Sequence, residues 1–256
     1  MSNQLFDAYF TAPAMREIFS DRGRLQGMLD FEAALARAEA STGLVPHAAV
    51  AAIEAACQAE RYDVGALANA IAIAGNSAIP LVKALGKVIA TGVPEAERYV
   101  HLGATSQDAM DTGLVLQLRD ALDLIEADLG KLADTLSQQA LKHADTPLVG
   151  RTWLQHATPV TLGMKLAGVL GALTRHRQRL HELRPRLLVL QFGGASGSLA
   201  ALGSKAMPVA EALAEQLNCP CPNSPGTPSV TAWWSLPRYW AWLPAAWASS
   251  AAISAC

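Results

Sequence analysis

The segment from Ser106 to His143 constrains the fold most, because its apolar residues recur every three or four positions along its length. This spacing predicts one amphipathic helix, roughly 55 Å long at a rise of 1.5 Å per residue. A helix of that length cannot cover its own apolar stripe, so we expect a helical bundle, formed in part between copies of the chain. The stripe consists of Leu114, Leu118, Leu122, Ile125, Leu129, Leu132 and Leu136.

Further helical spacing predicts an all-α fold. A second long helix should begin at Pro159, with Thr158 as its cap, and should break at Pro185. Another should start after the N-cap Ser20 and end before Gly43. Shorter helices are expected at residues 47–60, 64–74 and 79–90, and no segment shows a convincing strand pattern.

Composition excludes several classes of protein. The chain has 256 residues, of which 51% are hydrophobic, so it can bury a sizeable core. Its formal net charge is -2, with 20 basic and 22 acidic residues spread through the sequence, so we expect neither nucleic acid nor a membrane surface as a partner. Four cysteines do not form a disulfide framework, and no signal peptide is evident, so we expect a cytoplasmic protein.

The loop before the first long helix carries the first candidate site, His101 to Asp108. Thr105 and Ser106 suit an N-cap and Asp108 suits the first turn, which is enough to explain a helix start. The same arrangement also suits a carboxylate, because backbone N–H groups, hydroxyls and the positive end of the helix dipole converge there. We predict an anion site, with His101 as a further hydrogen-bond donor.

A second polar segment, Gly150 to Gly163, precedes the second long helix. The planar guanidinium of Arg151 matches a carboxylate, and Thr152 and Gln155 can add neutral hydrogen bonds. So much polarity ahead of a buried helix indicates a ligand or a partner subunit.

A third and weaker segment runs from Gln191 to Leu199. Its glycines allow a tight turn or a close backbone approach. Because no strand precedes it, we do not interpret it as a phosphate-binding loop.

Together these segments resemble a known superfamily. Residues 101–112 are similar to the first signature region of the fumarase, aspartase, argininosuccinate lyase and adenylosuccinate lyase superfamily, and residues 150–163 are similar to the second. The segments Pro13–Ser20 and Glu32–Ala36 agree as well, so the resemblance covers about 215 residues. It implies a long-helix bundle with residues 1–100 as an N-terminal helical domain and residues 101–215 as the first part of the central bundle.

Two departures from the sequence pattern of the superfamily lyases narrow the resemblance to one branch of the superfamily. Superfamily lyases that break C–N bonds have a histidine after Gly-Arg-Thr, where this chain has Trp153, and adenylosuccinate lyases have a His-Asp pair where it has Asn76 and Ser77. An indole N–H can only donate, so Trp153 cannot be a general acid or base. The sequence is similar here to the bacterial cycloisomerase branch, whose members act on carboxymuconate and close a lactone by adding a substrate carboxylate across a neighbouring double bond.

The resemblance implies roles for eight residues. One carboxylate of a small polycarboxylate substrate would be held by the first segment and another by the second, while Trp153 would shape the pocket and exclude water. It further implies a homotetramer with active sites shared between subunits. No metal-ligand cluster or nucleotide motif is visible, so we expect no metal and no cofactor. The expected catalytic residues are His101 and Ser106, and the expected substrate-binding residues are Thr105, Gln107, Arg151, Thr152, Trp153 and Gln155.

The last part of the chain departs from this pattern. The third signature of the superfamily, a glycine-serine loop, is absent, so we expect a bundle truncated before that loop and weak or no catalysis by the chain as printed. Residues 216–256 contain no acidic residue but five of the six tryptophans. We interpret this aberrant tail as a reading-frame error, and the alternative is a hydrophobic partner-binding extension.

Two other functions stay open at this point. The chain could belong to another lyase of the superfamily, such as one acting on adenylosuccinate. It could also be a helical assembly protein without catalytic activity, because helical periodicity alone does not require chemistry.

Overall fold

The computed structural model describes residues 8–221. These residues form two compact units, which are described separately: unit 1 contains residues 8–121 and 187–221, and unit 2 contains residues 122–186. The expected aberrant tail lies outside the described residues from residue 222 onward. No helix among residues 8–221 is long and apolar enough to cross a membrane.

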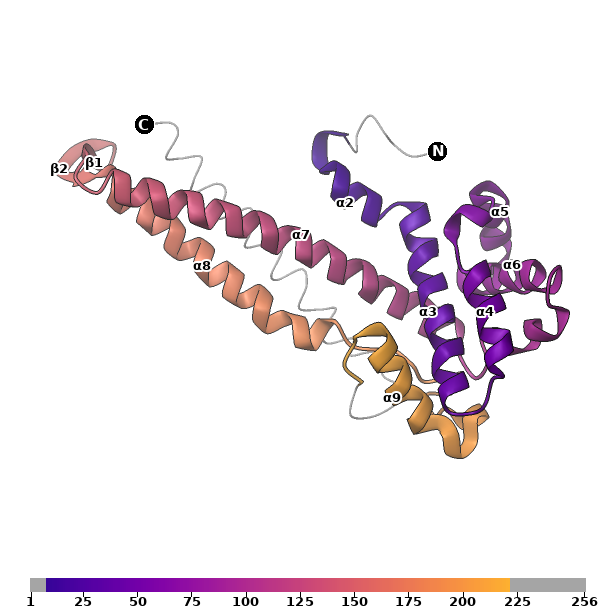
Figure 1. The fold of residues 1–256 in the computed structure, drawn as a ribbon. Coiled ribbons are helices and arrows are strands. Elements are labelled where there is room, and N and C mark those ends of the chain that lie inside the picture. Colours follow the sequence, from indigo (N-terminus) through magenta and orange to yellow (C-terminus); the bar gives the residue numbers. More distant parts are fainter. Residues whose placement is uncertain (1–7, 222–256) are drawn as a thin grey trace. The chain divides into compact units, whose positions relative to one another are not determined.

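Unit 1 is built of short helices around α3, which spans Asp21–Ser41. α9 packs along α3, although the two helices are far apart in sequence (Figure 1). The other elements of this unit, apart from the first part of α7, are α2 (Pro13–Ile18), α4 (His47–Ala56), η1 (Ala59–Arg61), α5 (Val64–Ala74), α6 (Ala78–Ala90), η2 (Pro94–Tyr99), η3 (Ala200–Lys205) and α9 (Ala206–Leu217).

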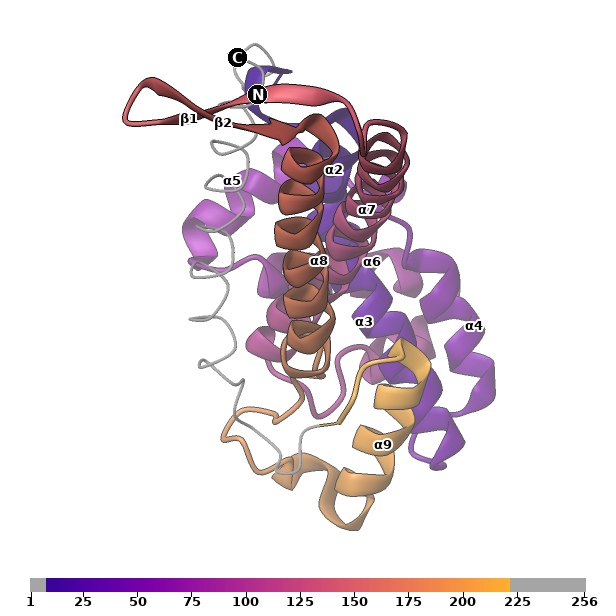
Figure 2. The same ribbon diagram turned by 90° about the vertical axis from the view of Figure 1, so that its left-hand side faces the viewer.

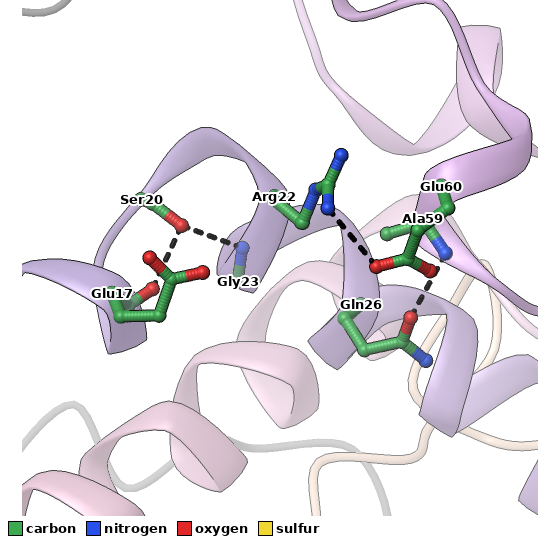
Figure 3. Close-up of polar contacts among 7 residues, drawn as sticks. All are labelled: Glu17, Ser20, Arg22, Gly23, Gln26, Ala59 and Glu60. Carbon is green, nitrogen blue, oxygen red and sulfur yellow. Dashed lines mark hydrogen bonds and ion pairs between the residues drawn. The ribbon is translucent and has the colours of Figure 1, made fainter. Parts of the chain in front are cut away.

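The start of α3 confirms the predicted cap. The Ser20 hydroxyl accepts a hydrogen bond from the backbone N–H of Gly23 at 3.0 Å and donates to the carbonyl of Glu17 at 2.7 Å (Figure 3). One turn further on, the Gln26 side chain accepts from the backbone N–H of Ala59 at 2.9 Å, which attaches the connection after α4 to α3. These contacts fix both the start of α3 and its neighbour.

A single apolar cluster fills the space between α3, α4, α5 and α6. Its largest fully buried members include Met28 and Leu29 from α3, Ile53 from α4 and Leu85 from α6. Burial of a leucine-sized side chain contributes about 1.5–3 kcal/mol, so this cluster holds α3 rigidly in place.

α7 confirms the strongest sequence prediction, because it is one helix from Ser106 to Lys142. It begins in unit 1 and continues into unit 2. There it is followed by α8, Leu162–Leu187, with which it forms an antiparallel pair. Arg184 of α8 pairs with Asp123 and Glu126 of α7, the latter at 2.9 Å.

The expectation of no strands is wrong at residues 147–161, although the fold is otherwise helical. β1 (Pro147–Thr152) and β2 (Gln155–Thr161) form an antiparallel hairpin that connects α7 to α8 (Figure 2). The ladder shifts register between Val149 and Arg151. Gly150 occupies this irregularity, where a Cβ would lie 2.3 Å from the carbonyl oxygen of Thr158.

Both predicted ends of the second long helix are also wrong. Pro159 lies in β2, opposite Val149, and a proline is tolerated there because a two-stranded sheet has only edge strands. The helix begins at Leu162 instead, and the hydroxyl of Thr161 accepts from the backbone N–H of Met164 at 3.1 Å. Pro185 does not end the helix, which continues to Leu187.

Candidate active site

The first predicted segment forms the loop between η2 and α7. His101 has a φ of +58°, a left-handed conformation that is uncommon for a residue other than glycine. His101, Thr105 and Ser106 are partly buried, while Gln107 is exposed. The structure therefore brings these four predicted residues together at the start of a long helix, where its dipole favours an anion.

Asp108 organises this loop from within. It is fully buried, and its Oδ2 accepts a hydrogen bond from the backbone N–H of Thr105 at 2.9 Å. The backbone N–H groups of Gly193 and Gly194 donate to the same carboxylate at 3.0 and 2.9 Å. Asp108 was predicted only as a first-turn residue, but its hydrogen bonds also connect the loop before α7 to the distant segment at Gly193 and Gly194.

Thr112 strengthens the same connection one turn later. Its hydroxyl donates to the carbonyl of Gln191 at 2.8 Å and accepts from the N–H of Gln191 at 3.1 Å. The rings of Phe31 and Phe192 lie 6.3 Å apart between centroids, so this segment also contacts α3. The third segment singled out in the sequence thus makes the close backbone approach that its glycines allow.

Glu32 of α3 holds His101 from the interior of unit 1. The Nδ1 atom of His101 lies 2.6 Å from Oε1 of Glu32, whose side chain is 2% exposed. Burial alone would lower the pKa of His101. The hydrogen bond and charge of Glu32, with the charge of Asp108, outweigh burial and raise that pKa above its ordinary value.

The second predicted group lies on the hairpin of unit 2. Arg151 is paired across the ladder with His156, and Thr152 with Gln155. All four residues are exposed. Among the described residues no carboxylate pairs with Arg151, so its guanidinium is available to an anionic ligand.

Trp153 and Leu154 form the two-residue turn of this hairpin. Their φ angles are +49° and +60°, which indicates a primed turn of the kind that favours Asn-Gly. Trp153 is 94% exposed and Leu154 is fully exposed. A strained turn that presents two large apolar side chains is unusual for a surface loop and is typical of a functional site.

Sequence reasoning missed Glu32 and the second role of Asp108. A signal for Glu32 was present, because it lies among apolar residues on the buried face of α3, between Met28 and Leu35. A carboxyl group at such a position needs a buried hydrogen-bonding or oppositely charged partner. Asp108 gave no comparable signal, since its distant partners are backbone groups.

The chain matches a family model and several known proteins. A family model described as a lyase matches residues 8–239. The chain therefore belongs to this lyase family, within the fumarase and aspartase superfamily that its two signature segments resemble.

Several relatives and solved structures with high sequence identity carry names that refer to 3-carboxy-cis,cis-muconate. The chain is 90% identical over 225 residues to a 3-carboxy-cis,cis-muconate cycloisomerase of Pseudomonas putida, covering 88% of this chain and 53% of the relative. It is 77% identical to one from Pseudomonas aeruginosa, covering 88% of this chain and 49% of the relative. The crystal structure of the 3-carboxy-cis,cis-muconate lactonizing enzyme from Pseudomonas putida matches with a TM-score of 0.84 and 95% identity, over 87% of this chain and 51% of that one. This chain thus spans about half the length of the relatives it matches.

Proposed function

We propose that the protein containing this chain is a cycloisomerase that converts 3-carboxy-cis,cis-muconate to a carboxymuconolactone during the breakdown of aromatic rings. The observation that carries the proposal is the 90% identity to a curated relative of that name across both predicted groups. The exposed Trp153 at the hairpin tip agrees with it, because a tryptophan there cannot supply the proton that C–N lyases need.

The reaction rearranges bonds without losing atoms. An oxygen of one substrate carboxylate forms a C–O bond to a carbon of the neighbouring double bond, and the π electrons of that bond move toward a second carboxylate. That carboxylate becomes an enolate-like dianionic group, and a proton delivered to the carbon next to it completes the lactone. Preorganised donors stabilise such developing charge most effectively.

Each of the two groups of residues binds one carboxylate of the substrate. His101, Thr105, Ser106 and Gln107 hold one carboxylate at the start of α7, where the helix dipole favours negative charge and the raised pKa of His101 favours its protonated form. Arg151, Thr152 and Gln155 hold another, and Trp153 shapes the pocket. The proton comes from a group outside these eight residues, and no metal or organic cofactor is expected to take part.

The active sites are shared between subunits of a homotetramer in this proposal. The two groups lie before and after α7 in the chain, and a helix of 37 residues is roughly 55 Å long. We infer that a substrate meets the first group of one copy and the second group of another. The exposed Leu132, Leu141 and Met164 on the α7–α8 pair support contacts between copies. The expected cytoplasmic location stays a prediction.

Product analysis tests the activity. Residues 1–221 would be joined to the remaining portion of the Pseudomonas putida relative and incubated with 3-carboxy-cis,cis-muconate or with adenylosuccinate. We expect loss of the diene absorbance and a product of unchanged mass from the first substrate only. Release of fumarate from adenylosuccinate would favour the other lyase, and no reaction with either substrate would refute the proposal.

An arginine pair supplies the matched control for the second group. Arg151→Ala is expected to slow lactone formation at least a hundredfold, because it removes a charge-assisted carboxylate contact. Arg177→Ala removes the same charge from the exposed surface of α8 and should have little effect. Equal activity of the two variants would exclude Arg151 from substrate binding.

A further inference from the structure

Two glutamates on the buried face of α3 lie outside the predicted site. Glu32 is 2% exposed and Glu39, two helical turns further on, is completely buried. Neither oxygen of Glu39 and only one oxygen of Glu32 has a hydrogen-bond partner among the described residues. Burying carboxyl groups in this way is costly, so a reason for keeping them should be found in what they contact.

The contact that Glu32 makes is with a strained histidine. Oε1 of Glu32 lies 2.6 Å from Nδ1 of His101, the length of a strong, charge-assisted hydrogen bond. His101 adopts a φ of +58°, a conformation that costs about 1–2 kcal/mol for a residue with a Cβ. A buried acid and a strained backbone therefore meet at one side chain, and such strain persists only where the surroundings fix it.

We propose that Glu32 is a positioning residue of the active site, which holds the His101 ring by Nδ1 and favours its cationic form, so that Nε2–H can donate to a substrate carboxylate. This inference rests on the proposed function. The tautomer explains why the charge matters. A neutral imidazole that donates Nδ1–H to Glu32 has a lone pair on Nε2, which would repel a carboxylate, whereas the imidazolium donates from both nitrogens.

The charges around His101 agree with this role. Glu32 from α3 and Asp108 from α7 face it, and together they raise the pKa of His101 although burial acts in the opposite direction. The charge of Glu32 also acts on Glu39 and on Cys57, the residue after α4. The pKa of each is raised first by burial and then by the charge of Glu32. Glu39, with a pKa of about 9, is uncharged near pH 7, so Glu32 supplies the negative charge on this face of α3.

The same substitution at the two glutamates tests the proposal. Glu32→Gln and Glu39→Gln change the same residue type on the same buried helix face, but only the first removes a contact to His101. The titration of His101 would be followed by NMR in the full chain without ligand, with the signal assigned from a His101→Asn variant. Binding of tricarballylate, a saturated tricarboxylate, would be measured by calorimetry across the same pH range.

In Glu32→Gln we expect the pKa of His101 to fall, because only the charge of Asp108 then opposes the effect of burial. Tricarballylate binding at pH 7 should weaken about tenfold or more. Glu39→Gln should leave both properties unchanged. An unchanged His101 titration in Glu32→Gln, or an equal fall in Glu39→Gln, would overturn the proposal.

A second variant covers the case in which Glu32→Gln does not fold. Glu32→Asp retains the charge but withdraws it by one methylene, so the pKa of His101 should lie between those of the wild type and an ordinary histidine. A pKa of His101 equal to that of the wild type would count against the contact. Failure of every protein to bind tricarballylate would instead count against the proposed function, because the titration of His101 is measured without ligand.

Discussion

Asp108 connects two loops through backbone hydrogen bonds from Thr105, Gly193 and Gly194. Removing its carboxylate would leave three N–H groups without their acceptor, two of them deeply buried. Each such group costs about 1–3 kcal/mol, so Asp108→Ala should lower the free energy of unfolding by about 3 kcal/mol or more. Urea denaturation followed by circular dichroism measures this loss.

Asp134→Ala provides the comparison, because Asp134 is exposed on the same helix. It should change stability by less than about 0.5 kcal/mol. Hydrogen exchange at Gly193 and Gly194 should speed up in Asp108→Ala alone. Unchanged protection at these two amides would show that the carboxylate does not hold the loop.

Glu39 should make stability depend on pH. Burial, and then the charge of Glu32, raises its pKa from 4.5 to about 9 in the folded chain. Between these values the folded chain binds a proton that the unfolded chain has released. The free energy of unfolding should therefore fall as pH rises, by about 1.4 kcal/mol per pH unit for one proton.

Glu39→Gln cannot ionise and should lose this slope. Its stability should match the wild type near pH 4.5 and exceed it at higher pH by about 1.4 kcal/mol for each pH unit, which amounts to several kcal/mol at pH 8. Chemical denaturation at several pH values gives the slope directly, and the exposed Glu215→Gln serves as the control. Parallel slopes for the wild type and Glu39→Gln would mean that Glu39 is ionised in the fold.

The chemistry of single residues was predictable where it depends on local sequence. Ser20 caps its helix as expected because a cap and its partner are three residues apart. Glu32 was not predicted to contact His101, because 69 residues separate them and only the tertiary fold brings them together. Local spacing thus identified the polar loop before α7, but not the Glu32 carboxylate that contacts His101.

α3 and α7 cross within unit 1 at two glycines. A Cβ on Gly27 would lie 2.7 Å from the carbonyl oxygen of Gly113, and one on Gly113 would lie 2.9 Å from the backbone nitrogen of Met28. Gly27→Ala should therefore push the helices apart and destabilise unit 1 by about 1–3 kcal/mol. Thermal unfolding monitored by circular dichroism would measure the effect.

Gly168 of α8 supplies the matched control. It also lies inside a helix, but a Cβ there meets nothing within 4 Å. Gly168→Ala should stabilise the protein by about 0.5–1 kcal/mol through helix propensity alone. If both alanine variants were equally stabilising, the crossing would not require glycine.

The hairpin was the element that sequence could not predict. Its strands are mostly exposed, so the alternation that reveals a half-buried strand is absent, and its turn carries Trp153 and Leu154 instead of Asn-Gly. Pro159 suggested a helix start for the same reason that it is tolerated in an edge strand, since its missing N–H needs no partner in either place. α7 was predicted correctly because a long periodic stripe outweighs such local ambiguity.

The proposed tetramer makes a prediction about mixtures of inactive variants. The variants would be made in residues 1–221 joined to the remaining portion of the Pseudomonas putida relative. His101→Ala removes a member of the group before α7, and Arg151→Ala removes a member of the group on the hairpin, so each variant alone should form lactone slowly. If one active site takes its two groups from different copies, some sites in a mixed oligomer receive both groups intact. Random mixing of equal amounts should restore roughly a quarter of the sites.

The experiment is co-expression of the two variants, followed by measurement of lactone formation. The control is a mixture of Arg151→Ala with Thr152→Ala, which lie on the same hairpin. If each site uses a single hairpin, neither variant can supply a complete second group. The activity of this mixture should therefore not exceed the sum of the activities of the two separate variants. Activity in the first mixture that stays equal to the sum of the separate variants would mean that both groups of a site belong to one copy, and the shared-site assembly would have to be abandoned.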